Sequence, residues 1–443
     1  MKKIIITIIF FFAITSYSQE KIVPNPIAIE LARSFTKDIF DLNGTDIVEP
    51  SVRVINSVSN DRFYQSAYIP YKENKFYVRV ELNGMYGSVP NDMKTFTPEI
   101  PQEKYNNDSL ISYMNIGFEG NQIKYSIRDT AKLVSYIFKT LLYDGINKPN
   151  GHSDRIQIPT KASTLLGKKR NDAIVIPQGG LERLANARFD TINQGLGGLY
   201  KVPDDIRNQI VGLLNSFPTY YSLSQGGNIN NLLVGVPQFT IGSFYGTEMT
   251  LRYIPALDYG EEFGKFSFWG VGISHNFSQY FYDNYERDNW QLAAQIAFQG
   301  SSLTNKVGIT QSEFESNANF LNFNIRTSKM IKNWFEFYAG FSYETIAMTN
   351  KFNYFLSVET QAQLGLLPYI YDDDGNRVGI GKADATAGYP GDTQPQQTSL
   401  DINSENLKFS FGLNKEIGDF AIYAGYSFSR FNIFNFGVAY TIR

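Results

Sequence analysis

Side chains that could carry out hydrolysis are few and scattered in this chain. The sequence contains two histidines and no cysteine, which excludes disulfides, thiolate zinc sites and cysteine nucleophiles. His275 ends a segment of alternating residues, and no serine or aspartate can be paired with it from spacing. His152 belongs to a polar His-Ser-Asp run typical of a loop. We therefore expect no enzyme, and the alternative of a hydrolase depends on His275 alone.

One acidic run resembles half of a calcium-binding loop. Residues 372–376 read Asp-Asp-Asp-Gly-Asn. If this glycine were the sixth loop residue, Ile370 and Gly381 would occupy the first and twelfth positions, where calcium needs carboxylates. Residues 167–168 and 195–197 likewise lack the neighbours of phosphate-binding and dinucleotide-binding loops. We predict a solvated turn, no metal site and no cofactor.

Eight charged residues share the polar phase of segments in which polar and apolar residues alternate. Alternate side chains of a strand point to opposite faces, so in a barrel these residues would face the lumen. They could select solutes in a channel, or they could form an ion-pair network that fills a narrow barrel. The network is favoured, because small barrels are packed inside by side chains. The lumen-lining candidates are Arg79, Glu81, Glu248, Arg252, Arg326, Glu336, Glu344 and Lys408.

The first residues have the pattern of a secretory signal peptide. Lys2 and Lys3 precede an apolar run over 4–14, and the small residues Ser16 and Ser18 follow. Cleavage is predicted after Ser18. The apolar run is too short for a membrane-spanning helix, which needs about 20 residues. The net charge of -3 gives no basis for binding nucleic acid.

Alternation over long segments predicts an all-β fold. Many of these segments reach the about 9–11 residues that a tilted strand needs to span a membrane. Aromatic residues crowd their apolar phase, as in the interfacial girdles of membrane barrels. The segments are 76–83, 236–243, 247–253, 266–277, 290–298, 321–326, 335–344, 407–414, 420–428 and 434–442.

The lengths of the connections give the barrel a direction. The linkers 244–246, 331–333 and 416–418 are short, whereas 303–316 and 350–403 are long. Outer-membrane barrels have short periplasmic turns and long outer loops. We predict a closed transmembrane antiparallel β-barrel of about 12 strands, with 10 to 14 open, in which 109–118 and 121–128 add a pair.

The region before the main barrel differs in pattern. Helical spacing is found at Ile27 to Phe40, and again at 133–142, 181–187 and 206–214. The insert is too long for an idle loop. It is expected to be a plug in the lumen or a cap over the mouth, and the alternative is a peripheral helical subdomain. We predict a signal peptide (1–18), an N-terminal helix with a periplasmic or plug segment (19–70), first barrel strands (71–128), the helical insert (129–234) and the main barrel (235–443).

Four segments carry a family resemblance: FYVRVELN (76–83), VPQFTIG (236–242), GTEMTLRYIP (246–255) and FWGVGISHN (268–276). In them the chain resembles an uncharacterised Bacteroidetes family of outer-membrane β-barrel proteins, filed as a domain of unknown function. The resemblance implies a barrel and a location in the outer membrane, but no activity. One departure is the non-aromatic final residue, Arg443, which leaves recognition by the barrel-assembly machinery open.

These patterns predict a channel or transporter of small or hydrophobic solutes in the outer membrane. The layout is loosely similar to plugged transporters of the fatty-acid type, which is an analogy of fold only. The alternative is an accessory protein whose barrel anchors the loops 303–316 and 350–403 for a partner. The expected partners are outer-membrane lipid, a solute, or another outer-membrane protein.

Overall fold

The computed structural model describes residues 22–63, 66–70, 76–119, 122–170, 172–195, 202, 204–223, 226–258, 264–282, 286–307 and 312–442. The predicted signal peptide, 1–18, lies outside the described residues. Among the helices of this part of the chain, none is long and apolar enough to cross a membrane.

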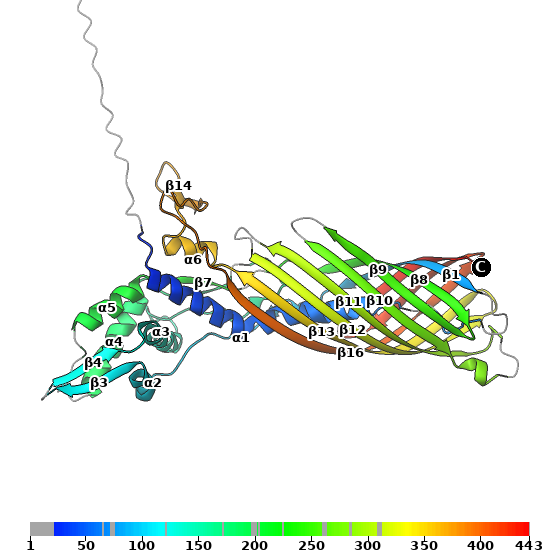
Figure 1. Cartoon of the computed structure of the whole chain (residues 1–443), viewed down its shortest axis with the longest axis horizontal. Helices are drawn as coiled ribbons and strands as arrows, with labels where there is room; N and C mark the ends of the chain where they lie inside the picture. The colour runs from blue at the N-terminus through cyan, green and yellow to red at the C-terminus, as the bar shows by residue number, and fades with distance from the viewer. Residues whose placement is uncertain are drawn as a thin grey trace, which may run out of the picture.

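Ten antiparallel strands close into a barrel (Figure 1). Closure is made by the first strand, which pairs on one side through Val78 with Ile442 and on the other through Tyr77 with Gly242. The sheet therefore has no open edge, which is required of a β-structure surrounded by lipid. The strands are β1 (Tyr77–Ser88), β8 (Asn231–Phe244), β9 (Thr247–Asp258), β10 (Lys265–Asn276), β11 (Gln291–Val307), β12 (Ser312–Ile331), β13 (Phe335–Tyr354), β16 (Gln396–Ile417), β17 (Phe420–Phe428) and β18 (Ile433–Ile442).

The prediction of about 12 strands is corrected to ten, because the pair expected at 109–118 and 121–128 does not join the barrel. That region contains a short helix, α2 (Asn107–Ser112), and a separate hairpin of β3 (Met114–Glu119) and β4 (Gln122–Ile127). Strands of 6 residues are shorter than the about 9–11 needed to span a membrane. Of the predicted first barrel strands (71–128), only β1 belongs to the barrel.

Apolar side chains face outward from the barrel and polar side chains face inward. On β16, Leu407, Phe409 and Leu413 are 61%, 42% and 48% exposed, whereas Lys408 between them is 1% exposed. On β12, Phe323 is 46% exposed. The apolar stripes therefore do not meet in a shared core, as they would in a soluble sandwich.

In the three longest strands this pattern reverses towards the end that is remote from the C-terminus. In β12, Phe323 and Leu321 face outward in the apolar part of the strand. Further along, the outward residues are the polar Asn319 and Asn317, and the inward residue Phe320 is apolar and buried. Strands β13 and β16 reverse in the same way. The outward apolar band of β13 covers 335–343, which matches the about 9–11 residues of a spanning strand. Beyond the band, β12, β13 and β16 continue with a polar exterior. We call this extended part of the barrel the high wall.

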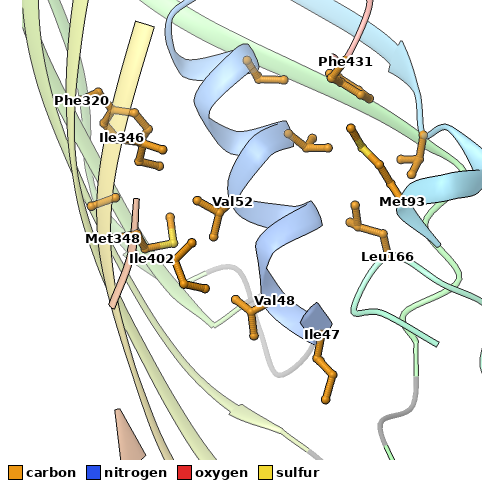
Figure 2. Close-up of a cluster of buried hydrophobic side chains, with 14 of the residues drawn as sticks. Ile47, Val48, Val52, Met93, Leu166, Phe320, Ile346, Met348, Ile402 and Phe431 are labelled. Atoms are coloured by element: carbon orange, nitrogen blue, oxygen red, sulfur yellow. The ribbon is translucent and has the colours of Figure 1, made fainter. Parts of the chain in front are cut away.

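The high wall encloses the second half of a long helix, α1 (Pro26–Ser59). Figure 2 shows Val48 and Val52 of α1 between two groups of apolar side chains. Wall residues lie on one side, and residues from the chain between β1 and β8 lie on the other with Phe431 from the turn between β17 and β18. The two groups are Phe320, Ile346, Met348 and Ile402, and Met93, Leu166 and Phe431.

The first half of α1 leaves the barrel and is buried by three other helices, α3 (Thr130–Ile146), α4 (Gly180–Gly195) and α5 (Asp204–Asn215). Leu31, Phe35 and Ile39 of α1 share a core with Phe138 of α3 and Leu214 of α5. We call residues 90–223 the mouth domain, because they lie at the end of the barrel opposite the C-terminus (Figure 1).

The long connection between β13 and β16 covers the start of α1. It contains α6 (Val358–Gln363) and a small hairpin, β14 (Tyr369–Tyr371) with β15 (Arg377–Ile380). Ala28 and Ala32 of α1 pack against Leu356 and Leu364 of this connection. The helix is therefore fixed outside the barrel by two separate parts of the chain.

Candidate functional site

The predicted lumen-lining residues all lie on the inward face of the barrel strands. Seven of them are buried, and the side chain of Arg79 is 20% exposed. The seven are Glu81, Glu248, Arg252, Arg326, Glu336, Glu344 and Lys408. Arg252, Arg326, Glu336 and Lys408 contact one stretch of chain, residues 57–63 and 66–70, which we call the lumen segment. This stretch falls within the segment 19–70, for which an N-terminal helix with a periplasmic or plug segment was predicted.

The lumen segment continues α1 across the barrel interior. The helix ends with Asn60 as its C-cap, and Arg62 has a φ of 53°, a left-handed conformation that turns the chain. Where the chain leaves the helix, its last backbone carbonyls have no partner within the helix. Because these carbonyls are buried, they need other hydrogen-bond donors. The barrel wall supplies these donors.

Two wall arginines donate to the carbonyls of the lumen segment. Arg252 Nη1 donates to Ser59 O at 2.8 Å, and Arg252 Nη2 donates to Asp61 O at 2.7 Å. Arg326 Nε donates to Ser66 O at 2.8 Å. Hydrogen bonds from an ionised donor are about twice as strong as neutral ones, so the two wall arginines hold both parts of the segment.

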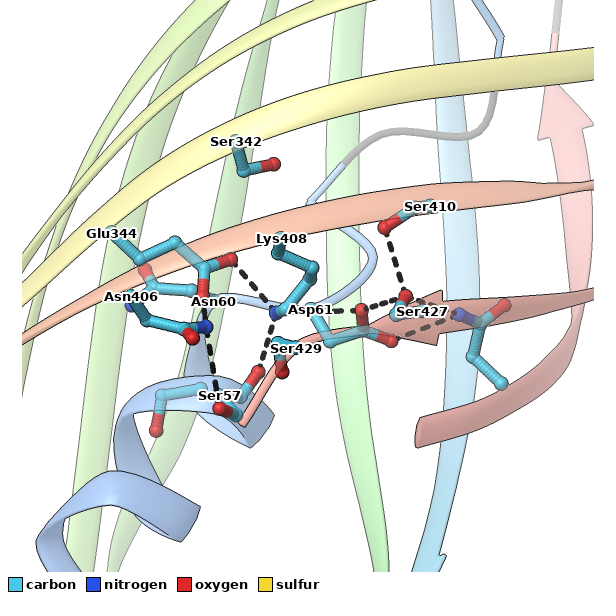
Figure 3. Close-up of polar contacts among 12 residues, drawn as sticks. Ser57, Asn60, Asp61, Ser342, Glu344, Asn406, Lys408, Ser410, Ser427 and Ser429 are labelled. Carbon is cyan, nitrogen blue, oxygen red and sulfur yellow. Dashed lines mark hydrogen bonds and ion pairs between the residues drawn. The ribbon is translucent and has the colours of Figure 1, made fainter. Parts of the chain in front are cut away.

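Lys408 joins the wall, the segment and two carboxylates (Figure 3). Its Nζ donates to Ser57 O at 2.7 Å. It also lies 2.7 Å from a Glu344 oxygen and 3.6 Å from Asp61 Oδ1. Asn406 Nδ2 donates to the second oxygen of Glu344 at 2.7 Å. A buried ion pair is tolerated when further hydrogen bonds satisfy its remaining donors and acceptors, and this cluster meets that condition.

The carboxylate of Asp61, in the lumen segment, contacts the two shortest strands of the barrel, β17 and β18. Ser427 Oγ of β17 donates to Asp61 Oδ1 at 2.7 Å, and Asn435 Nδ2 of β18 donates to Asp61 Oδ2 at 3.0 Å. Together with Lys408 of β16, these contacts fix the segment to three neighbouring strands, β16, β17 and β18.

Arg62 is held by aromatic side chains of the wall. Its guanidinium carbon lies 3.7 Å from the ring centroid of Tyr423 and 5.0 Å from that of Tyr338, and Arg62 Nη1 also donates to Tyr338 OH. Such cation–π contacts are strongest where water is excluded. Tyr338 stands in the polar phase of the 335–344 segment, and an aromatic residue in that phase is the signal that could have revealed it.

The segment and the wall leave almost no free space at this level. A cavity of about 10 Å³ remains, with Asp61, Arg62, Tyr338 and Lys408 among its lining residues. That volume suffices for about one water molecule. At this level the lumen segment and the barrel wall therefore form a packed polar core.

The residues considered for catalysis and metal binding lie elsewhere. The ring nitrogens of His275 contact Thr247 Oγ1 at 2.8 Å and Tyr280 OH at 3.0 Å, so these contacts give the hydrolase alternative no support. Asp372 accepts from the backbone N–H of Asp374 and Asn376 at 3.1 and 2.7 Å, which is a turn. No group of three or more metal-binding side chains occurs in the described part of the chain.

The chain belongs to a family of unknown function, DUF6588, whose model matches residues 1–442. No curated protein matches it. Among solved structures, it is similar to the attachment invasion locus protein Ail of Yersinia pestis in complex with sucrose octasulfate, with 11% identity, 44% of this chain and 93% of that chain covered, and a TM-score of 0.20. The outer membrane protein OpdK of Pseudomonas aeruginosa has 9% identity, 83% and 99% coverage, and a TM-score of 0.11.

Proposed function

We propose that this DUF6588 protein is an outer-membrane β-barrel with a closed lumen, whose barrel anchors the mouth domain at the outer surface for contact with a partner. The apolar exterior supports a membrane location. At the end of the barrel near the C-terminus, Trp290 and Trp334 are 51% and 67% exposed. Lys329 and Lys415 lie 5.3 and 5.8 Å from their ring centroids. Exposed tryptophan beside lysine is typical of a membrane–water interface.

The connections support the orientation of the mouth domain towards the outside. Turns of two or three residues join β8 to β9, β12 to β13 and β16 to β17 at the C-terminal end. The mouth domain and the long connection between β13 and β16 lie at the other end. Short turns face the periplasm in outer-membrane barrels, which supports a mouth domain at the cell surface.

The observation that carries the closed lumen is the packing of the lumen segment. Wall side chains donate to its carbonyls, and the remaining cavity of about 10 Å³ holds about one water. The segment is also fixed at both ends, since β1 follows it and α1, which precedes it, is buried in the mouth domain. A barrel with this packed interior is suited to anchoring the mouth domain in the membrane.

Cysteine labelling tests the orientation, because the chain has no cysteine of its own. Thr160→Cys lies in the mouth domain, and Asp419→Cys lies in the turn between β16 and β17; both positions are exposed. On intact cells, a membrane-impermeant maleimide should label Thr160→Cys and should label Asp419→Cys only after lysis. The reverse pattern would overturn the orientation. In planar bilayers, the wild-type protein should show no conductance steps.

A transporter of small or hydrophobic solutes is the second candidate, and the polar lumen wall favours it. Water could solvate this wall if the lumen segment withdrew. Ser328 Oγ accepts from Ala67 N at 3.1 Å, so a disulfide between Ala67→Cys and Ser328→Cys would hold the segment in place. Conductance or solute uptake that is present when this pair is reduced and abolished when it is oxidised would establish the transporter and reject the closed lumen.

A further inference from the structure

Strands β1, β8, β17 and β18 are shorter than the strands of the high wall, and we call the part of the barrel that they form the low side. Five cationic side chains lie where the mouth domain meets this low side. We call them the basic rim: Lys94, Lys161, Lys168, Lys169 and Arg430. Lys94 is half-buried and the other four are exposed. Among the described residues, none of the five has a carboxylate oxygen within 4.0 Å. The neighbouring Arg170 is paired with Asp172 at 2.6 Å and is not included.

Backbone contacts bring the rim residues together. Thr164 N donates to Lys94 O at 3.1 Å, and Ser163 Oγ donates to Lys168 O at 2.8 Å. Lys161 immediately precedes β5 (Ala162–Ser163), which pairs with β2 (Thr95–Phe96) next to Lys94. Arg430 adjoins Phe431, which shares a core with Met93 (Figure 2). Residues from three distant parts of the sequence thus form one positive edge.

The rim stands just above the apolar exterior of the barrel. Lys94 Nζ donates to Asn230 Oδ1 at 2.8 Å, and Asn230 comes immediately before β8. Leu233, three residues further along, is 68% exposed on the outward face. Three residues of a strand span about 10 Å. Because the strand is tilted, the distance between Asn230 and Leu233 along the membrane normal is smaller than this. Each headgroup layer of a bilayer is about 5–7 Å thick, so Lys94 lies at headgroup level.

The neighbouring strand β16 of the high wall has the other charge. Beyond the apolar band, the exterior of β16 presents the exposed carboxylates Asp401 and Glu405. An anion in the outer leaflet is therefore attracted to the low side near β1, β8, β17 and β18. Phe428 and Phe434, 48% and 45% exposed on that side, offer an apolar surface for acyl chains.

We propose that the basic rim binds the phosphate groups of an anionic outer-leaflet lipid whose acyl chains lie along β1, β8, β17 and β18. The proposal rests on the outer-membrane location of the barrel and adds the lipid class that it selects. A lysine or arginine near an anionic surface contributes a factor of about five in affinity. Binding should weaken with salt, because the charges are exposed.

The test measures binding of diphosphorylated lipid A to the full-length protein in detergent micelles by native mass spectrometry. Combining Lys168→Gln, Lys169→Gln and Arg430→Gln should weaken binding by about 100-fold. A control with the same charge loss combines Lys104→Gln, Lys132→Gln and Lys148→Gln in the mouth domain, where Lys104 and Lys132 are exposed and Lys148 is half-buried; its binding should stay within about twofold of wild type. Both variants should keep the heat-modifiable migration of a folded barrel.

Two further ligands separate the sources of phosphate. The same lipid without phosphates should bind wild type and rim variant equally. Soluble glucosamine bisphosphate should bind far more weakly than the lipid. Equal losses in rim and control variants, or binding independent of phosphate, would overturn the proposal. Tight binding of the soluble sugar would also overturn it, by pointing to a free phosphorylated ligand.

Failure of the outer-membrane location is distinguishable, because it would appear in cell fractionation while micelle binding reports on the rim alone.

Discussion

Replacing Lys408 tests whether the interior is a dry, paired network. Lys408 is 1% exposed, and Lys408→Met keeps most of the side-chain volume while removing the charge. The change leaves Glu344 and Asp61 without their shared cation and Ser57 O without its donor. Removing one partner of a buried ion pair costs about 3–5 kcal/mol, so we expect a loss of that size in the free energy of unfolding.

The assay is denaturant unfolding in detergent micelles, followed by tryptophan fluorescence. The three tryptophans, Trp269, Trp290 and Trp334, are all half-exposed or more on the barrel exterior, so their emission reports the loss of detergent contact on unfolding. Lys132→Met is the control, because its side chain is 72% exposed; its effect should stay within about 0.5 kcal/mol.

A double-mutant cycle separates pairing from packing. Glu344→Gln alone leaves Lys408 with Asp61 and Ser57 O, and should also destabilise the barrel. In the double variant neither the lysine nor Glu344 is charged, so its cost should fall short of the sum of the single costs by at least about 1 kcal/mol. Additive costs, or a loss below about 1 kcal/mol for Lys408→Met, would mean that these groups are hydrated, and the closed-lumen reasoning would be wrong.

Three further changes test the outer parts of the structure. Phe431→Ala removes a side chain that is 0% exposed and should cost about 3–5 kcal/mol in the same unfolding assay. Asp392→Ala removes the carboxylate that pairs with Arg33, and limited proteolysis should then cut the β13–β16 connection faster than in wild type. Burial and the nearby Glu359 raise the pKa of Tyr369 to about 12, against about 10 for a free phenol. The unfolded phenol therefore ionises first, and the connection should lose protection from hydrogen exchange as the pH rises from about 10 to 12; Tyr369→Phe should abolish that part of the loss.

The membrane-facing strands were predictable because lipid outside and polar groups inside impose a period of two on the sequence. Segments such as 407–414 keep this period without interruption. The separate hairpin β3–β4 has a strand-like pattern too, and nothing in its local sequence says that it lies outside the barrel. Strand count therefore depended on a length criterion that two strands of 6 residues do not meet.

The second half of α1 was missed for a different reason. The prediction covered Ile27 to Phe40, whereas the helix runs to Ser59 and contains Pro50. A proline inside a helix removes a hydrogen bond and usually marks a break. In addition, the two halves of the helix are buried by different partners, so no single apolar stripe runs along its length.

This division of α1 limits how the lumen can open. Withdrawal of the whole helix towards the outside would pull the buried Val52 from its core, and withdrawal towards the periplasm would pull Phe35 from the mouth domain. Burying one such side chain is worth about 1.5–3 kcal/mol, and each core contains several. A change confined to residues 60–63 and 66–70 of the lumen segment leaves both cores intact, so it costs far less. If a solute does cross this barrel, residues 60–63 and 66–70 therefore rearrange while α1 stays in place.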